Sequence, residues 1–235
     1  EKLMDRFTAE GFDAAFIGLG LPKATSVTET ELEGLSDAMD FLAQAKQPGQ
    51  LDLTGKSVAV IGGGNTAMDV AVTARQLGAK DVYLIYRRSF KEMPAWSAER
   101  QRAIDKGVHF LILTQPLQYH GPDGKLSSVK LCPTRLGDPD ASGRRRPEPM
   151  TASAYDLDMD LVVEAIGQVA DPDIEQTLPG VEIVRGRIQT NNGSLATSRQ
   201  AVFAGGDLVR GPSTVVAAVA DGTKAAREID QFLQS

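Results

Sequence analysis

The 235-residue chain can form one large domain or two smaller ones, and its 42% hydrophobic and 24% charged residues are typical of a globular protein. Its formal net charge of −6 excludes a non-specific nucleic-acid binder, which needs a clustered cationic surface. Its single cysteine, Cys132, excludes a disulfide, a Cys-x-x-Cys redox pair and a cysteine-ligated iron–sulfur cluster within this chain.

The first predicted elements are a buried strand and a surface helix. Residues 12–19 form an apolar run with a Gly-x-Gly at its end, which predicts a strand and a turn. A proline and a lysine follow, so we do not interpret this turn as a phosphate-binding loop. Residues 33–46 have apolar positions at helical spacing and precede a Pro-Gly pair, which predicts a surface helix and a linker.

The next segment alternates strands and helices. Strands are predicted over residues 57–61, 81–86 and 108–113, and helices over residues 65–77 and 95–106. This order, with nearly continuous apolar strands, predicts a parallel sheet that is covered on both faces.

The remaining sequence predicts antiparallel hairpins and a return to a sheet. Residues 115–158 are short alternating runs broken by turn dipeptides, residues 160–167 form an apolar strand, and residues 181–207 add short strands. Ser213 can cap a last helix. The expected apolar face of that helix consists of Val215, Val219, Gly222, Ala226, Ile229 and Leu233.

The most specific motif is a Gly-x-Gly-x-x-Ala turn between a strand and a helix, formed by Gly62, Gly64 and Ala67. Gly62 permits a sharp turn, Gly64 lets backbone amides approach phosphates, and Ala67 lets the helix pack on the strand. The N–H groups of the first helical turn, from Asn65 and Thr66 onward, then face a pyrophosphate.

The end of the next strand distinguishes NAD from NADP. An NAD site would have an acidic residue there to bind the adenosine ribose hydroxyls. The strand ends instead at Arg87 and Arg88, whose guanidinium groups suit a 2′-phosphate, and the alternative is a pair of solvated arginines. The run 144–146 is also arginine, and we interpret it as a solvated loop.

Two acidic residues near this motif have open roles. We interpret Asp69 as a structural residue rather than a contact of the phosphate loop. Glu99 is either a contact of the nicotinamide end of the cofactor or a solvated helix residue.

A partial second motif, Gly205-Gly206-Asp207, follows a strand near the C-terminus. Asp207 suits a hydrogen bond from a ribityl hydroxyl, and the helix N-terminus near Thr214 and Val215 suits negative charge on a flavin ring. The alternative is a plain strand-turn-helix connection.

Four motifs together resemble the flavin-dependent NADPH oxidoreductases, typified by the small subunit of bacterial glutamate synthase and the NADPH-oxidising part of dihydropyrimidine dehydrogenase. They are Gly-Gly-Gly-Asn-Thr-Ala-Met-Asp, Tyr-Arg-Arg followed by Met-Pro-Ala, Glu-Ala-Ile-Gly-Gln, and Val-Phe-Ala-Gly-Gly-Asp. The resemblance implies an α/β fold in which a Rossmann-like NAD(P)-binding domain, a parallel sheet plus an antiparallel meander, is inserted into a three-layer β/β/α FAD-binding domain. It implies partial FAD-domain segments at 1–49 and 167–235, and an NAD(P)H domain at 50–166.

The resemblance also implies the cofactor-binding residues and the reaction. The residues are Gly62, Gly64, Asn65, Thr66, Ala67, Arg87, Arg88, Gly167, Gly206, Asp207 and Thr214. Members of the family pass hydride from NADPH to FAD and single electrons onward to iron–sulfur clusters and a partner subunit, and this step needs no catalytic acid or base. The family's N-terminal FAD fingerprint and cluster-binding cysteines are absent from this sequence. We therefore expect the chain to bind NADP(H), to retain FAD weakly or not at all, and to depend on a missing N-terminal segment and a larger subunit.

Two other functions stay open. A flavin-free NADP-dependent dehydrogenase would use a Tyr-x-x-x-Lys pair or a His–Asp relay, and no tyrosine of this chain has a lysine four residues on. An NADP(H)-binding module without turnover is the non-enzymatic alternative.

The sequence predicts neither a metal site nor a membrane span. His109 and His120 have no second histidine or carboxylate at ligand spacing, so we interpret them as strand or loop residues. No run approaches the ~18 apolar residues of a membrane span, and the expected compartment is the cytoplasm. Because the sequence opens at Glu1 close to a strand, we expect it to be a piece of a longer polypeptide.

Overall fold

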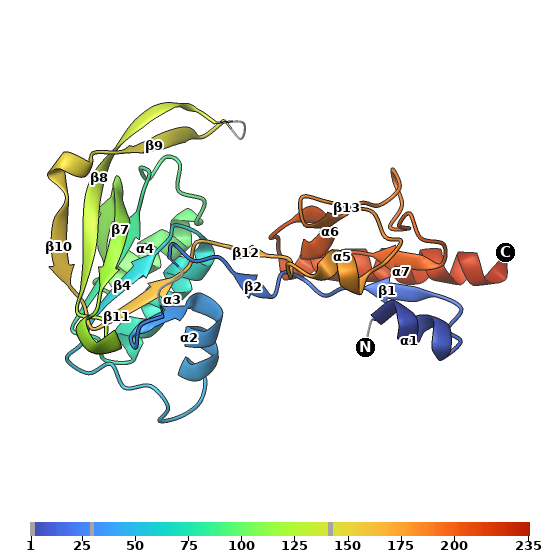
Figure 1. Cartoon of the computed structure of the whole chain (residues 1–235), viewed down its shortest axis with the longest axis horizontal. Helices are drawn as coiled ribbons and strands as arrows, with labels where there is room; N and C mark the ends of the chain where they lie inside the picture. Colours follow the sequence, from blue (N-terminus) through green and yellow to red (C-terminus); the bar gives the residue numbers. More distant parts are fainter. Residues whose placement is uncertain (1–2, 29–30, 141–142) are drawn as a thin grey trace. The chain divides into compact units, whose positions relative to one another are not determined.

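The computed structural model describes residues 3–28, 31–140 and 143–235. The chain divides into two compact units, unit 1 with residues 1–23 and 168–235, and unit 2 with residues 24–167. It passes between them through two short strands that pair with each other, β2 (Lys23–Ala24) and β12 (Gln168–Val169) (Figure 1).

Unit 2 contains a five-stranded parallel sheet with the order β3-β11-β4-β5-β6. The strands are β3 (Leu35–Asp37), β4 (Ser57–Ile61), β5 (Asp81–Tyr86), β6 (His109–Ile112) and β11 (Leu161–Glu164). Val60 of β4 lies beside Val163 on one side and Leu84 on the other. β11 therefore returns from late in the sequence to a place between β3 and β4.

Alternate residues of the parallel strands face two different layers. Val58 and Val60 pack against the helices α2 (Ala38–Ala45), α3 (Asn65–Gln76) and α4 (Ser97–Asp105). Ala59 and Ile61 pack against an antiparallel sheet. Its elements are β7 (Thr114–His120), β8 (Ser128–Pro139), β9 (Arg145–Pro149) and β10 (Tyr155–Asp158), with 3-10 turns η1 (Pro122–Gly124) and η2 (Thr151–Ser153). The prediction of a parallel sheet covered on both faces is confirmed.

Unit 1 contains a parallel pair of strands and a long helix, α7 (Val215–Gln234). Its remaining elements are α1 (Leu3–Ala9), β1 (Ala15–Ile17), α5 (Ile174–Thr177), β13 (Ile183–Val184), β14 (Arg187–Ile188), β15 (Val202–Ala204) and α6 (Asp207–Arg210). Ile17, Leu178 and Leu208 lie in its hydrophobic core. Neither α7 nor any other helix in the described part of the chain has the length and apolar character needed to cross a membrane.

The helix expected over residues 33–46 begins later than predicted. Residues 35–37 are a strand because they pair with β11. The side chain of Asp37 then caps α2, since its Oδ1 accepts hydrogen bonds from the N–H groups of Met39 and Asp40. A carboxylate inside the expected helix was the signal for this cap.

The division between the units also comes earlier in the sequence than the expected domain boundary near residue 50. Residues 24–49 lie in unit 2, where β3 pairs with β11 and Phe41 of α2 is buried in the core on the helix side. The second division, after Gly167, lies next to the expected boundary. Which cofactor each unit binds stays a prediction.

The cap and the buried face of α7 differ from the expectation. Thr214, not Ser213, is the N-cap residue, and its hydroxyl accepts a hydrogen bond from the Ala217 N–H. The helix buries Asp221 and Ala225, whereas the expected apolar face is largely exposed, for example at Val219 and Leu233. Asp221 binds groups inside unit 1, and this sets which side of the helix faces the core.

Candidate functional site

The turn between β4 and α3 needs glycine at two positions for steric reasons. Gly62 has a φ of +146°, and a Cβ there would lie 2.3 Å from the carbonyl oxygen of Ala165. A Cβ on Gly63 would lie 2.5 Å from Cδ2 of Tyr86. Both glycines therefore allow close packing of the turn within the protein. The fingerprint alone does not predict this role for Gly63, although the run of three glycines was a signal for it.

Gly64 differs because the space beside it is open. A Cβ at this position would have no heavy atom within 4 Å beyond the adjacent residues, and its φ of −87° and ψ of 175° suit any residue. Gly64 is the N-cap of α3, so no side chain caps the first N–H groups of the helix. An open approach to uncapped helical N–H groups suits a phosphate. Ala67, in the first turn, is fully buried, as its packing role requires.

Asn65 connects the glycine turn to the segment that follows β5. Its side-chain Oδ1 accepts a hydrogen bond from the Trp96 N–H at 2.9 Å, and the Gly63 carbonyl oxygen accepts one from the Ala95 N–H at 3.0 Å. Trp96 is the only tryptophan of the chain and is 61% exposed. Thr66, the next residue of α3, is exposed. A natural fluorophore therefore lies beside the candidate phosphate site.

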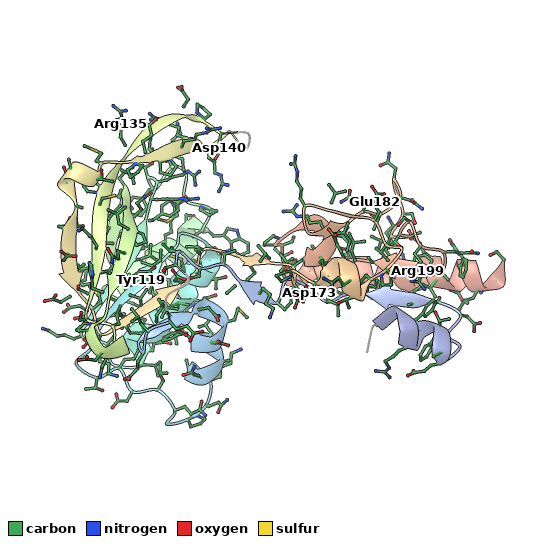
Figure 2. The ribbon with its side chains drawn as sticks, viewed as in Figure 1. Tyr119, Arg135, Asp140, Asp173, Glu182 and Arg199 are labelled. Carbon is green, nitrogen blue, oxygen red and sulfur yellow. The ribbon has the colours of Figure 1, made fainter. Side chains whose placement is uncertain are left out.

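The two arginines at the end of β5 lie in different environments. The Arg87 side chain is exposed, whereas Arg88 is only 6% exposed. Arg88 Nη2 lies 3.0 Å from Asp140 Oδ2, and Arg88 Nε donates to the Arg145 carbonyl oxygen at 2.7 Å. Figure 2 labels Asp140, which follows β8. Of this pair, Arg87 is the residue open to a ligand, and Arg88 connects β5 to the β8–β9 hairpin.

The Tyr86 side chain links the arginines to the glycine turn. Its ring lies against Gly63, and its hydroxyl donates to the Glu92 carbonyl oxygen at 2.9 Å. Burial raises the pKa of Tyr86, while the positive charges of Arg88, Arg144 and Arg87 act in the opposite direction. Tyr86 therefore contacts the glycine turn with its ring, and the charges of three arginines influence its phenol.

Asp69 and Glu99 are electrostatic neighbours on α3 and α4. Burial raises the pKa of Asp69, the Glu99 carboxylate raises it further, and Arg102 opposes both. Glu99 Oε2 lies 3.7 Å from Arg102 Nη1. A like-charged neighbour does not distinguish the two roles, so the structural interpretation of Asp69 and the nicotinamide contact of Glu99 both stay predictions.

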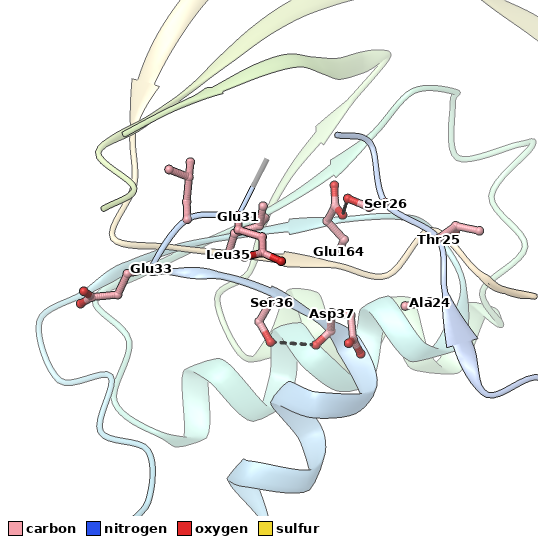
Figure 3. Close-up of a pocket in the computed structure, with 10 residues that line it drawn as sticks. Ala24, Thr25, Ser26, Glu31, Glu33, Leu35, Ser36, Asp37 and Glu164 are labelled. Carbon is pink, nitrogen blue, oxygen red and sulfur yellow. Dashed lines mark hydrogen bonds between the residues drawn. The ribbon is translucent and has the colours of Figure 1, made fainter. Parts of the chain in front are cut away.

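A pocket of about 420 Å³ lies at the end of β11, and its wall is acidic (Figure 3). Glu164 accepts hydrogen bonds from Ser26 Oγ at 2.5 Å, the Val27 N–H at 3.0 Å and the Tyr119 hydroxyl at 2.7 Å. Burial and then the Glu164 carboxylate raise the pKa of Tyr119. Further carboxylates of the wall belong to Glu31, Glu33 and Asp37. This wall repels phosphates, so the pocket does not suit the phosphates of a dinucleotide.

Gly167 lies where the chain leaves unit 2. Its φ is +120°, and its carbonyl oxygen accepts hydrogen bonds from the Thr25 N–H at 3.2 Å and from Thr25 Oγ1 at 3.0 Å. The residue therefore joins the entering and leaving segments of unit 2. This contact is structural, and a cofactor contact by Gly167 stays a prediction.

In unit 1, Asp221 of α7 holds the glycine turn after β15. Its Oδ2 accepts hydrogen bonds from the Gly206 N–H at 2.8 Å and from Arg210 Nε at 2.9 Å. Burial would raise the pKa of Asp221, but the hydrogen bonds from Arg210 and Gly206 outweigh it and hold this pKa below its ordinary value. The sequence analysis missed Asp221, and a carboxylate within an Ala- and Val-rich helix was the available signal.

Asp207 and Thr214, which are expected to contact a flavin, accept hydrogen bonds from nearby backbone N–H groups. Asp207 Oδ1 accepts a hydrogen bond from the Ser213 N–H at 3.1 Å, and Thr214 caps α7. Val215 and Val216, which open α7, are 80% and 78% exposed. FAD binding by Gly206, Asp207 and Thr214 stays a prediction.

Each of the two histidines lies near an aspartate. His109 Nε2 lies 3.8 Å from Asp81 Oδ1, and His120 Nε2 lies 3.3 Å from Asp156 Oδ1. Among the residues with described positions, no three His, Cys, Asp or Glu side chains form a group that could hold a metal ion. Cys132 is a buried free thiol.

Comparisons with known proteins agree with the fold. A family model described as pyridine nucleotide-disulphide oxidoreductase matches residues 9–222. The crystal structure of thioredoxin reductase from T. acidophilum has a TM-score of 0.73 and 22% identity, with coverage of 94% of this chain and 66% of that chain. The predicted α/β fold class is confirmed.

Two curated relatives extend beyond this chain. It is 42% identical to the beta subunit of NADP(+)-dependent formate dehydrogenase of Moorella thermoacetica and 36% identical to the glutamate synthase (NADPH) small chain of Escherichia coli strain K12. Each alignment covers 95% of this chain, but only 32% and 51% of those proteins respectively. The chain thus spans between about a third and a half of their length. With the family model matched over most of its residues, the chain belongs to the pyridine nucleotide-disulphide oxidoreductase family.

Proposed function

We propose that unit 2 binds NADP(H), and that the chain serves the transfer of hydride from NADPH to an FAD that unit 1 binds in part. The observation that carries this proposal is the uncapped N-terminus of α3 beside Gly64, with the exposed Arg87 at the end of the neighbouring strand. Negative charge is stabilised at such a helix N-terminus by N–H groups and by the helix dipole.

Each residue of the site then has a separate task. Gly62 shapes the turn, Gly64 gives the pyrophosphate room, and the backbone N–H groups of Asn65 and Thr66 bind it. Arg87 binds the 2′-phosphate with a charge-assisted hydrogen bond, which NADH cannot receive. Arg88 supports this from its buried position without direct contact, which refines the role expected for it.

Fewer observations support the FAD site than support the NADP(H) site. Asp207 has a carboxylate at the turn that Asp221 holds, and α7 begins at Thr214. These residues fit the binding of a ribityl hydroxyl and of the pyrimidine edge of a flavin. When bound, FAD would supply a hydride acceptor that can pass on single electrons. Because the relatives are longer than this chain, we expect segments outside it to complete the FAD site, and the chain alone to retain FAD weakly or not at all.

The electron acceptor is proposed by chemical class only. The names of the two relatives pair NADP(+) with a formate dehydrogenase and NADPH with a glutamate synthase, so the redox partner of the nucleotide differs between relatives. We propose iron–sulfur clusters or a partner subunit as the acceptor, in segments beyond this chain.

The first experiment measures binding of NADPH and NADH to the 235-residue chain by calorimetry. We expect NADPH to bind at least about tenfold more tightly than NADH, and Arg87→Gln to remove most of that difference. Equal losses for both nucleotides in Arg87→Gln would contradict the 2′-phosphate assignment.

The second experiment measures NADPH-dependent dye reduction with FAD added. Dye reduction that requires FAD supports the proposed flavin reaction. Tight NADPH binding without dye reduction at saturating FAD favours the binding module without turnover. NADPH oxidation by a carbonyl substrate in the absence of FAD would favour the flavin-free dehydrogenase.

A further inference from the structure

Among the described residues, three polar contacts attach the β8–β9 hairpin to Arg87 and Arg88, which follow β5. Two come from Arg88, whose guanidinium binds Asp140 Oδ2 at 3.0 Å and the Arg145 carbonyl oxygen at 2.7 Å. In the third, Thr134 Oγ1 donates to the Arg87 carbonyl oxygen at 2.8 Å. Because a buried guanidinium without its partner is costly, the Arg88–Asp140 ion pair fixes the hairpin to the strand end.

The same carboxylate places a third arginine. Asp140 Oδ1 accepts a hydrogen bond from the Arg144 N–H at 3.3 Å, while Asp140 Oδ2 binds Arg88. The side chain of Arg144 is exposed, and its charge acts on the Tyr86 phenol together with those of Arg87 and Arg88. The Asp140 carboxylate therefore joins the Arg144 backbone to Arg88, which follows Arg87 at the edge of the sheet where we place the 2′-phosphate.

We propose that Arg144 is a further specificity-determining residue for NADPH, which binds the adenosine 2′-phosphate together with Arg87, and that Asp140 is its positioning residue. This inference rests on the proposed function of Arg87. A phosphate monoester carries a charge of about −1.5 to −2 near neutral pH, so one guanidinium does not neutralise it. The sequence favours a solvated loop for the run 144–146, but only Arg144 lies outside a strand, because Arg145 and Arg146 begin β9. All three residues are exposed, and Arg144 differs by its backbone contact with Asp140.

The test compares Arg144→Gln with Arg146→Gln, which remove the same charge from the same hairpin. Dissociation constants for NADPH and NADH are measured from quenching of Trp96 fluorescence and checked by calorimetry. We expect Arg144→Gln to weaken NADPH binding about five- to twentyfold, and NADH binding less than about twofold. We expect Arg146→Gln to change either constant less than about twofold. Equal effects of the two substitutions on NADPH would overturn the role of Arg144.

Asp140→Ala tests the positioning role separately. It removes a negative charge beside the phosphate, so a purely long-range charge effect would tighten NADPH binding. Our proposal predicts the opposite: NADPH binding weakens and NADH binding does not, because the hairpin loses its attachment to Arg88. Tighter NADPH binding would overturn the positioning role of Asp140. Circular dichroism checks folding, and if this variant does not fold, the Arg144–Arg146 comparison decides the proposal.

Arg87→Gln keeps the two proposals distinguishable. If Arg87→Gln weakens NADPH selectively but Arg144→Gln does not, only the inference about the hairpin fails. If Arg87→Gln has no selective effect, the 2′-phosphate assignment itself fails.

Discussion

Replacement of Gly64 and Gly62 by alanine should separate binding from folding. At Gly64 the added methyl group meets no protein atom, and the backbone conformation suits alanine. We expect the free energy of unfolding of Gly64→Ala to stay within about 1 kcal/mol of the parent, with a small gain from the less flexible unfolded chain. The methyl group fills the approach to the α3 N-terminus, so NADPH binding should weaken at least about tenfold.

Gly62→Ala is the matched control and should have the opposite result. Its Cβ would lie 2.3 Å from the Ala165 carbonyl oxygen, about 1 Å inside ordinary contact, and φ would stay at +146°. Backbone strain of about 1–3 kcal/mol and overpacking of about 1–3 kcal/mol then combine to a loss of roughly 2–6 kcal/mol in stability.

Urea unfolding gives the stabilities, and Trp96 fluorescence gives the NADPH dissociation constants. A Gly64→Ala variant that binds NADPH like the parent would refute the assignment of the open space to the pyrophosphate. A Gly62→Ala variant as stable as the parent would refute the packing argument for the turn.

Three further substitutions test the electrostatic contacts by urea unfolding. Asp221→Ala should cost about 2–4 kcal/mol, since it leaves Arg210 unpaired, although partial exposure of that arginine lowers the penalty. Because the folded pKa of Asp221 is lowered, the stability that its carboxylate contributes is present above the unfolded pKa and is lost as the pH falls through the folded pKa. A cost of Asp221→Ala that is unchanged in acid would contradict this. Tyr119→Phe should cost about 1.5–3 kcal/mol by removing a hydrogen bond to buried Glu164, and a loss below about 0.5 kcal/mol would contradict that contact. Asp69→Asn should stabilise the chain near neutral pH, because the folded pKa of Asp69 is raised and its ionised carboxylate therefore destabilises the folded state. Below the unfolded pKa the carboxyl group is protonated in both states, so the substitution should have no such effect in acid. Equal effects at both pH values would contradict this.

The parallel sheet could be predicted from the sequence because its strands are buried on both faces. The strand 57–61 and the helix from Asn65 were predicted with nearly the observed bounds, since a continuous apolar run and a glycine turn mark them. The strand 35–37 was not predicted, because it is three residues long and its partner, β11, is distant in the sequence. Local periodicity carries no information about such a pairing.

The site could be predicted from the sequence only where one residue type determines the local backbone structure. The glycine turn follows from its spacing, whereas the different environments of Arg87 and Arg88 depend on a hairpin about 50 residues later. The exposed valines of α7 could not be predicted either. Its apolar spacing is regular, but the orientation of the helix depends on the contact of Asp221 with Gly206.

The most direct test of the proposed NADP(H) site is a crystal structure of the chain with NADP⁺. We predict that the pyrophosphate accepts hydrogen bonds from the backbone N–H groups of Asn65 and Thr66, beside Gly64, and that the 2′-phosphate contacts Arg87. A nucleotide bound elsewhere in the chain, or a 2′-phosphate directed away from the end of β5, would contradict the proposed site.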